Sequence, residues 1–383
     1  MSNWDSWLDG ALGELAERDL LRRLEPIEAI DAVHVRGTDQ RDLTLFSSND
    51  YLGLSHHPKV RQALAKSANQ VGMGPRGSAL VCGYTTAHQA LERDLAELTG
   101  CEEALLCPTG FAANLAVISS LAGPDVAVFS DALNHASIID GCRLARRRGA
   151  SVQVYPHGDV DALAGLLEAS DAERKLIVTD SVFSMDGDLA PLDRLVELKR
   201  AHGALLVVDE AHGTLVFGEK GAGVAEHFGV EEQVDVHVGT LSKAVGALGG
   251  FVATSSPLRQ WIFNRGRSFV FSTAQPVPVV EAARAAIAVA RTEPKIRRSL
   301  WERVEQLGAQ LGRRLNSPIV PIILGEEARA LGASRQLLDN GFHVIAIRPP
   351  TVPAGTSRLR VALSAAHTAE DVDRLAVILA ELL

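Results

Sequence analysis

The sequence lacks several features that mark large classes of protein. Only four cysteines occur in 383 residues, Cys82, Cys101, Cys107 and Cys142, and their spacing fits no metal site, so we expect reduced thiols. No apolar run reaches the ~18–20 residues that a membrane span needs. There is no internal repeat and no low-complexity tract. The formal net charge of −9 disfavours general nucleic-acid binding.

What remains is the composition of an ordinary soluble protein, with 46% hydrophobic and 22% charged residues. Residues 1 to about 24 predict an amphipathic helix, because tryptophan and leucine recur at helical spacing among acidic residues. A targeting segment would instead begin with basic residues, so we expect a cytoplasmic protein.

The middle of the chain alternates between apolar runs of strand length and helical patterns. Such an alternation is typical of an α/β fold, in which a mostly parallel sheet carries helices on both faces. Ligands of these sheets bind beyond the carboxyl ends of the strands. The strands are expected at residues 104–107, 126–129, 152–155, 176–179, 204–208 and 234–238.

The rhythm changes near residue 272, where long helices replace the regular alternation. We therefore predict a large domain over 47–272 and a smaller α+β domain over 273–383. Residues 1–46 would supply the N-terminal helix and short strands.

Residues 240–250 read T-L-S-K-A-V-G-A-L-G-G and hold one lysine, Lys243, directly after a predicted strand. A lysine in a crowded glycine-rich turn is typical of a Schiff-base lysine, whose pKa burial lowers. The alternative is a surface lysine in a glycine-rich loop.

A second strand ends in D-E-A-H-G, which places Asp209 and His212 at the same edge of the sheet as Lys243. A buried carboxylate needs a cationic partner, so a structural ion pair is one interpretation. The other is an acid that keeps a pyridinium nitrogen protonated beside the lysine, as pyridoxal phosphate chemistry requires.

Three further strand ends carry residues suited to the same cofactor. The helix that opens at T-G-F-A presents backbone N–H groups to a phosphate. His135, in N-H-A-S, could lie over an aromatic ring or simply cap a helix. The D-S-V-F-S stretch offers Asp180 and Ser184. The phosphate candidates are Gly110, Phe111, Ala112, Thr240, Ser242, Ser272 and Thr273.

Together these motifs resemble the α-oxoamine synthases, pyridoxal phosphate enzymes of fold type I, from about Arg22 to the C-terminus. S-S-N-D-Y-L-G-L, G-S-A-L-V-C-G and S-V-F-S-M-D-G-D belong to the same resemblance. It implies that Lys243 binds the cofactor covalently and then acts as the general base. It also implies that Asp209 pairs with the ring nitrogen, that His135 stacks on the ring and that His212 and Ser184 contact its oxygen.

The stretch I-R-P-P-T-V-P-A-G-T-S-R-L-R most resembles the members that condense L-alanine with a pimeloyl thioester in biotin biosynthesis. By this resemblance Arg348, with Asn49 and Thr351, would meet the substrates, and Arg22 would meet the distal carboxylate. The residues alone do not choose among Arg348, Arg358 and Arg360. The resemblance further implies a homodimer with a shared site.

Three other functions remain open from the sequence. The nearest is an α-oxoamine synthase that uses glycine and another acyl-CoA; the others are a plain aminotransferase and a non-catalytic cofactor carrier or regulator. One departure from the family is Ala79, which stands where many relatives have arginine in G-S-R.

Overall fold

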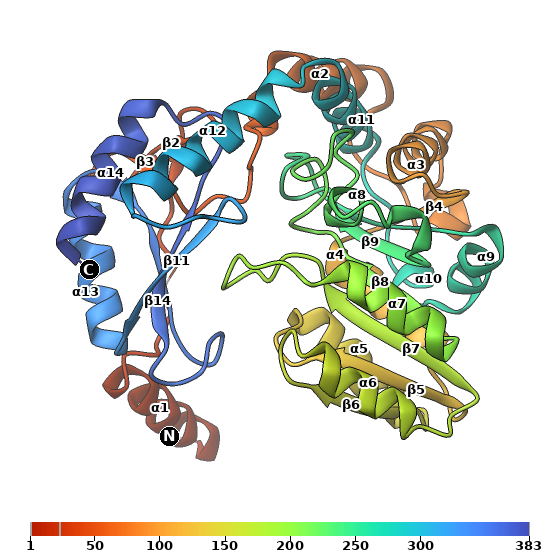
Figure 1. Ribbon diagram of the computed structural model, residues 1–383. Helices are drawn as coiled ribbons and strands as arrows, with labels where there is room; N and C mark the ends of the chain where they lie inside the picture. The colour runs from red at the N-terminus through yellow and green to blue at the C-terminus, as the bar shows by residue number, and fades with distance from the viewer. Residues whose placement is uncertain (1, 23, 383) are drawn as a thin grey trace. The chain divides into compact units, whose positions relative to one another are not determined.

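The computed structural model describes residues 2–22 and 24–382, and the chain forms two compact units (Figure 1). Unit 1 comprises Met1–Tyr51, Met185–Gly187 and Ser299–Leu383. Unit 2 comprises Leu52–Ser184 and Asp188–Arg298. The three-part division drawn from the sequence is a different partition and stays a prediction.

Unit 2 is built on a seven-stranded sheet, which confirms the predicted α/β fold. Only β10 runs antiparallel to its neighbours; the other pairs are parallel. In spatial order the strands are β4 (Glu103–Cys107), β10 (Gly250–Thr254), β9 (Val236–Thr240), β8 (Leu205–Asp209), β7 (Arg174–Asp180), β5 (Val126–Asp131) and β6 (Ser151–Tyr155).

Helices cover both faces of this sheet, so its central strands β5 and β9 are buried along their whole length. Val117 and Ile118 of one helix pack with Val128 and Val178 of the strands in the main core. The helices are α2 (Pro58–Val71), α3 (Thr86–Thr99), α4 (Gly110–Leu121), α5 (Ala136–Arg147), α6 (Val160–Glu168), α7 (Leu192–His202), α8 (Val224–His227), α9 (Ser256–Arg265), α10 (Arg267–Val270) and α11 (Val277–Thr292). Short turns of helix occur at η1 (Leu54–His56), η2 (Ala79–Gly83) and η3 (Glu231–Gln233).

Unit 1 contains two small sheets, in agreement with the predicted α+β character of the C-terminal region. One has the order β1 (Glu28–Ala29), β2 (His34–Arg36), β3 (Asp42–Leu45), β12 (Phe342–His343). The other has the order β11 (Ile319–Gly325), β14 (Ser357–Ala362), β13 (Ile345–Ile347). The helices are α1 (Asn3–Glu17), α13 (Glu327–Asp339) and α14 (Ala369–Leu382), while α12 (Lys295–Gln310) begins in unit 2.

The N-terminal helix is shorter than predicted. A capping box between Ser2 and Asp5 begins α1, but the helix ends at Glu17 rather than near residue 24. Asp19 adopts a left-handed φ of 55°, and the N–H of Leu20 turns back to the carbonyl of Leu15. A non-glycine residue in that region cannot continue a helix, so the chain leaves it there.

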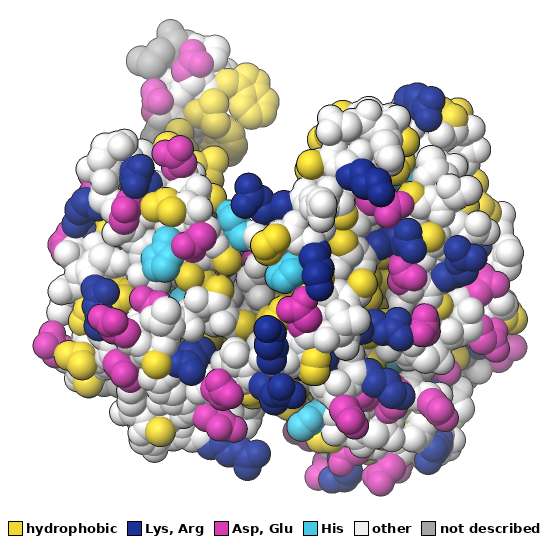
Figure 2. Space-filling model, turned by 90° about the horizontal axis from the view of Figure 1, so that it is seen from above, with side chains coloured by type: hydrophobic (Ala, Val, Ile, Leu, Met, Phe, Trp, Pro, Cys, Tyr) yellow, Lys and Arg dark blue, Asp and Glu magenta, His cyan; other side chains and the backbone are white. Residues whose placement is uncertain are grey.

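On the face drawn in Figure 2, acidic and basic side chains are interspersed. Within residues 2–22 and 24–382, no helix is long and apolar enough to cross a bilayer. The same residues contain no cluster of three or more His, Cys, Asp or Glu side chains arranged to hold a metal ion.

A histidine in unit 2 lies between two carboxylates. His157 contacts Asp131 through Nδ1 at 3.0 Å and Asp188 through Nε2 at 2.7 Å, with its side chain 29% exposed. Hydrogen bonds to these two carboxylates raise the pKa of His157 to about 10. Because the folded state binds this proton more tightly than the unfolded chain, the ion pairs stabilise the fold fully below pH ~6.5 and are lost as the pH rises through about 10.

We therefore expect His157→Gln to lower the free energy of unfolding by a few kcal/mol at pH 6, and by progressively less toward pH 10. Urea unfolding of both proteins at several pH values measures this difference. A difference that stays constant across the range would contradict the assignment.

Candidate active site

The carboxyl ends of the parallel strands meet at one edge of the unit 2 sheet. Asp180 and Asp209 end β7 and β8 and are partners in the strand register, and Thr240 ends β9. A cavity of about 240 Å³ opens at this edge. Its lining residues are Thr109, Gly110, Phe111, His135, Ser137, Asp180, Ser184, Asp209, Ala211, His212, Thr240, Ser242 and Lys243. The fold therefore brings together ten of the residues proposed from the sequence.

Lys243 is half-buried and lies in a turn that the backbone holds firmly. The N–H of Leu241 donates to the carbonyl of Gly249 at 2.9 Å, and the N–H of Gly246 donates to the carbonyl of Lys243 at 2.8 Å. Gly246 has a φ of 71°, and a Cβ there would lie 2.4 Å from the backbone N of Ser55. Only glycine fits this position, so the turn presents the lysine in one place.

Asp209 is buried and its carboxylate is oriented by two donors. Asn114 Nδ2 donates to Oδ2 at 2.6 Å, and the N–H of Ala211 donates to Oδ1 at 2.8 Å. Burial and the neighbouring Asp209 carboxylate raise the pKa of Asp180 well above its usual range, while Lys243 acts in the opposite direction. The site thus combines a held carboxylate, a second acid that favours its protonated form and one lysine.

His135 is both a helix cap and a lining residue, so the two interpretations of it are compatible. Its Nδ1 accepts from the N–H of Ser137 at 3.2 Å and lies 2.7 Å from the Ser137 hydroxyl. The backbone N–H of His135 donates to Asp180 Oδ2 at 2.9 Å. The pKa of His135 is lowered, mainly by burial. The carboxylate of Asp209 opposes this shift, and the charge of Lys243 adds to it. The ring is therefore fixed in direction and favours the neutral form.

The start of α4 forms another part of the cavity wall. Gly110 and Phe111 line it, whereas the N–H of Ala112 donates to the Thr109 hydroxyl at 3.0 Å, and Ala112 is not among the lining residues. A Cβ on Gly110 would lie 3.2 Å from Thr240 Cβ, so the glycine permits the helix end to approach that strand end. A helix N-terminus beside hydroxyl groups is suited to an anion.

Hydroxyl groups stand beside this helix end. Thr240 Oγ1 lies 2.8 Å from Ser242 Oγ and donates to the carbonyl of Gly249 at 2.9 Å. The two other predicted hydroxyl donors are elsewhere in unit 2: Ser272 lines a separate small cavity, and Thr273 pairs with Ser78 in an isolated bridge.

The residues proposed for substrate binding belong to unit 1. Arg22 Nη2 donates to Thr351 Oγ1 at 3.2 Å, and Arg348 Nη1 donates to the backbone carbonyl of Asp19. Asn49 Oδ1 accepts from Arg360 Nη2 at 3.0 Å. Arg22 and Thr351 are thus neighbours, whereas Asn49 contacts Arg360 rather than Arg348.

Sequence reasoning missed three polar residues of the site, Asn114, Ser137 and Thr109. Asn114 lies four residues after Gly110 in α4, one helical turn along, so helical spacing carried the signal that it faces the same edge. Ser137 is the serine of N-H-A-S and bonds both His135 and Asn114. Thr109 and Ala211 complete the lining, directly beside residues that had been proposed.

Comparisons with known proteins show the family of this chain. The family model for aminotransferase class I and II matches residues 41–379. An 8-amino-7-oxononanoate synthase from Anaeromyxobacter dehalogenans (strain 2CP-1) is 50% identical over 98% of this chain and 95% of its own. This chain belongs to the 8-amino-7-oxononanoate synthase family. A synthase of that name from Arabidopsis thaliana is 54% identical over 88% of this chain and 74% of its own.

Solved structures extend the likeness beyond the 8-amino-7-oxononanoate synthases. A Sphingomonas wittichii serine palmitoyltransferase has a TM-score of 0.92 at 34% identity, covering 100% of this chain and 97% of its own. A form of SPT solved with PLP has a TM-score of 0.93 at 32% identity over 98% of each chain. The 8-amino-7-oxononanoate synthase from Francisella tularensis has a TM-score of 0.75 at 27% identity, covering 89% of this chain and 98% of its own.

Proposed function

We propose that this chain binds pyridoxal phosphate at Lys243 and condenses L-alanine with a pimeloyl thioester. The products are 8-amino-7-oxononanoate, CO2 and the free thiol, and the reaction belongs to biotin biosynthesis. The names of the relatives support this assignment. The observation that carries it is one cavity holding Lys243, Asp209, His135 and the start of α4.

The residues of the cavity fit this cofactor. When bound, pyridoxal phosphate supplies an electron sink for the pair of electrons left at the amino-acid Cα. Asp209, held by Asn114 and Ala211, keeps a proton on the ring nitrogen. The Lys243 amine removes the Cα proton as general base.

Other side chains hold the cofactor in place. His135 would stack on the ring, and His212 and Ser184 would contact its hydroxyl oxygen. The backbone N–H groups at the start of α4 and the neighbouring hydroxyls would hold the phosphate. The proposed phosphate contacts are Gly110, Phe111, Thr240 and Ser242, all of which line the cavity.

Gly250→Ala should weaken cofactor binding. A Cβ at Gly250 would lie 2.4 Å from the N of Gly110 and the carbonyl of Thr109, so the start of α4 must move. We expect a loss of about 1–3 kcal/mol of stability and a higher dissociation constant for pyridoxal phosphate. Gly165→Ala is the matched control, because it lies in α6 with nothing within 4 Å. Spectrophotometric titration and thermal unfolding measure both effects; equal affinity in Gly250→Ala and wild type would refute the placement.

Arg348 is proposed to receive the carboxylate of alanine, with Asn49 near it. A guanidinium binds a carboxylate in a bidentate manner, a stronger interaction than its present contact with the carbonyl of Asp19. Arg22 and Thr351, which contact one another, are proposed to meet the distal carboxylate of the pimeloyl group.

Arg348→Ala should raise the KM for alanine by about 10- to 10²-fold, because it removes a charge-assisted contact worth about 1.5–3 kcal/mol. Arg22→Ala should instead raise the KM for the thioester and leave that for alanine unchanged. Steady-state kinetics with each substrate varied in turn separates the two. A thioester effect in Arg348→Ala with no change for alanine would reverse the assignment.

We also propose that two copies form a homodimer in the cytoplasm. Thr273 is exposed and does not line the cavity of its own chain, so the phosphate contact proposed for Ser272 and Thr273 would reach the partner subunit. Mixing Lys243→Ala with Thr273→Ala subunits tests this. Activity regained on mixing supports shared sites.

The direct test is an activity assay of the purified protein. Alanine, glycine or serine is supplied as the amino acid, and pimeloyl-CoA or pimeloyl-acyl carrier protein as the thioester. Turnover with alanine that releases CO2 and free thiol is the expected result. Turnover with glycine and another acyl-CoA but none with alanine would replace this function by that of a glycine-using α-oxoamine synthase.

A further inference from the structure

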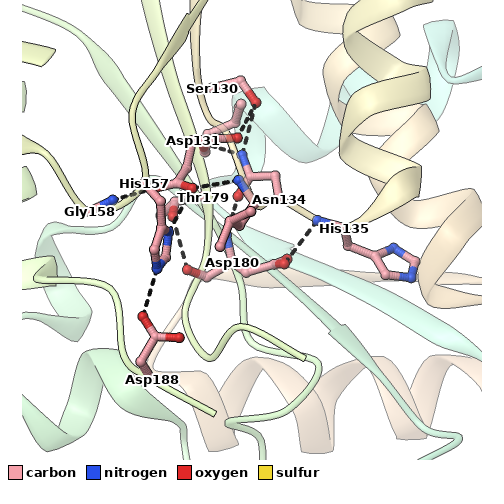
Figure 3. A network of polar contacts seen from close by, with 11 residues as sticks. Ser130, Asp131, Asn134, His135, His157, Gly158, Thr179, Asp180 and Asp188 are labelled. Carbon is pink, nitrogen blue, oxygen red and sulfur yellow. Dashed lines mark hydrogen bonds and ion pairs between the residues drawn. The ribbon is translucent and has the colours of Figure 1, made fainter. Parts of the chain in front are cut away.

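His157 does not line the cavity, yet it joins two loops that do (Figure 3). One loop follows β5 and carries His135; the other follows β7 and carries Ser184. The histidine lies between them, with Asp131 on one ring nitrogen and Asp188 on the other. Because both carboxylates accept, both ring nitrogens donate and the ring carries a positive charge.

At the end of β5, Asp131 accepts hydrogen bonds that hold the loop leading to His135. Its Oδ1 accepts from the N–H of Leu133 at 2.8 Å as well as from His157, and its Oδ2 accepts from the N–H of Gly158 at 2.8 Å. Asp131 is buried, with 3% of its surface exposed to solvent. Both oxygens of the Asp131 carboxylate are therefore held in these hydrogen bonds.

The same loop is tied to β7 by a second residue. Asn134 Nδ2 donates to the carbonyl of Val178 at 2.9 Å, and Asn134 Oδ1 accepts from the N–H of Asp180 at 2.8 Å. Asp180 in turn accepts from the N–H of His135. Figure 3 shows these contacts as one continuous network that runs from His157 to His135.

On the other side, Asp188 anchors the segment that holds Ser184. The chain leaves unit 2 after Ser184 and returns to it at Asp188. The N–H of Phe183 donates to the carbonyl of Asp188 at 3.0 Å, and the Phe183 ring lies edge-on to His157 with centroids 4.2 Å apart. His157 thus contacts both residues that bracket Ser184.

We propose that His157 is a positioning residue: through Asp131 and Asp188 it sets the places of His135 and Ser184 in the cavity. This inference rests on the proposed function, in which those two residues contact the pyridoxal phosphate ring. His157 acts through its neighbours and touches neither cofactor nor substrate. The bound ring should therefore tilt when the link is broken, although the lysine, the acid and the phosphate site remain.

The test compares holoenzymes of wild type, His157→Gln and Asp188→Asn. The control is His34→Gln, because His34 also contacts an aspartate, Asp31, at 2.8 Å, but belongs to unit 1 and does not line the cavity. The measurements are the circular dichroism of the cofactor band, the dissociation constant for pyridoxal phosphate, kcat, the KM for each substrate and the unfolding midpoint.

In both site variants we expect an altered cofactor dichroism and a kcat lowered about 10- to 10²-fold, because small misplacements of reacting groups are costly. The KM for the thioester should stay within about twofold, since no contact to it is proposed here. His34→Gln should match wild type. If His157→Gln fails to fold, Asp188→Asn still breaks the charged link at a half-exposed position.

The results separate this inference from the function it rests on. Wild-type protein without a cofactor band or alanine turnover would overturn both. Active wild type together with variants that lose only thermal stability, keeping dichroism and kcat, would overturn the positioning role alone.

Discussion

Lys243→Ala should abolish both turnover and the visible absorbance of bound cofactor. The substitution removes the covalent attachment and the general base together, and a general base alone contributes about 10²–10⁴-fold to a rate. We therefore expect kcat to fall by at least about 10³-fold. The turn itself should survive, because its bonds from Leu241 and Gly246 are made by the backbone.

The control for this change is Lys220→Ala, an exposed lysine outside the cavity lining. It should keep the absorbance and the activity of wild type. Absorbance spectra before and after borohydride reduction measure the attachment directly. A Lys243→Ala protein that still reduces to a stable cofactor adduct would show that another amine holds the cofactor.

Asp209→Asn should lower kcat by about 10²–10³-fold with little change in fold. Losing one member of a buried charge pair costs about 3–5 kcal/mol, and here the partner is the protonated ring nitrogen of the proposed cofactor. The amide can still accept from the N–H of Ala211. Asn114 Oδ1 has no hydrogen-bond partner among the described residues, so the Asn114 amide can turn to accept from the new amide.

Because the shape and the hydrogen bonds are kept, the unfolding midpoint of Asp209→Asn should stay close to that of wild type while turnover falls. Calorimetry and single-turnover kinetics with alanine separate these two quantities. Activity within about threefold of wild type would mean that Asp209 does not control the ring nitrogen. Equal losses of stability and activity would point to the structural ion pair considered from the sequence.

Much of the fold followed from local pattern. The parallel strands were predictable because a strand buried on both faces is mainly apolar, as in the Val-Ala-Val-Phe run that begins β5. Most of the cavity was predictable for a related reason. Polar residues such as Asp209 and Lys243 stand out at the ends of apolar strands, and parallel strands bring their carboxyl ends to one edge.

Other features depended on contacts between distant segments. Nothing in the local sequence of residues 342–343 indicates that β12 pairs in parallel with β3, 298 residues earlier in the chain. The end of α1 at Glu17 depended on backbone turns that its amphipathic pattern does not record.

The sequence by itself determined the α/β class, the strand-end motifs and the lysine and acid of the site, because these are expressed in short stretches of chain. Only the tertiary structure decided which side chains hydrogen-bond to the site residues and fix their positions. Asn114 reaches Asp209 across 95 residues, and His157 joins Asp131 to Asp188. Such hydrogen bonds depend on strand order and loop closure in space, so spacing along the chain does not reveal them.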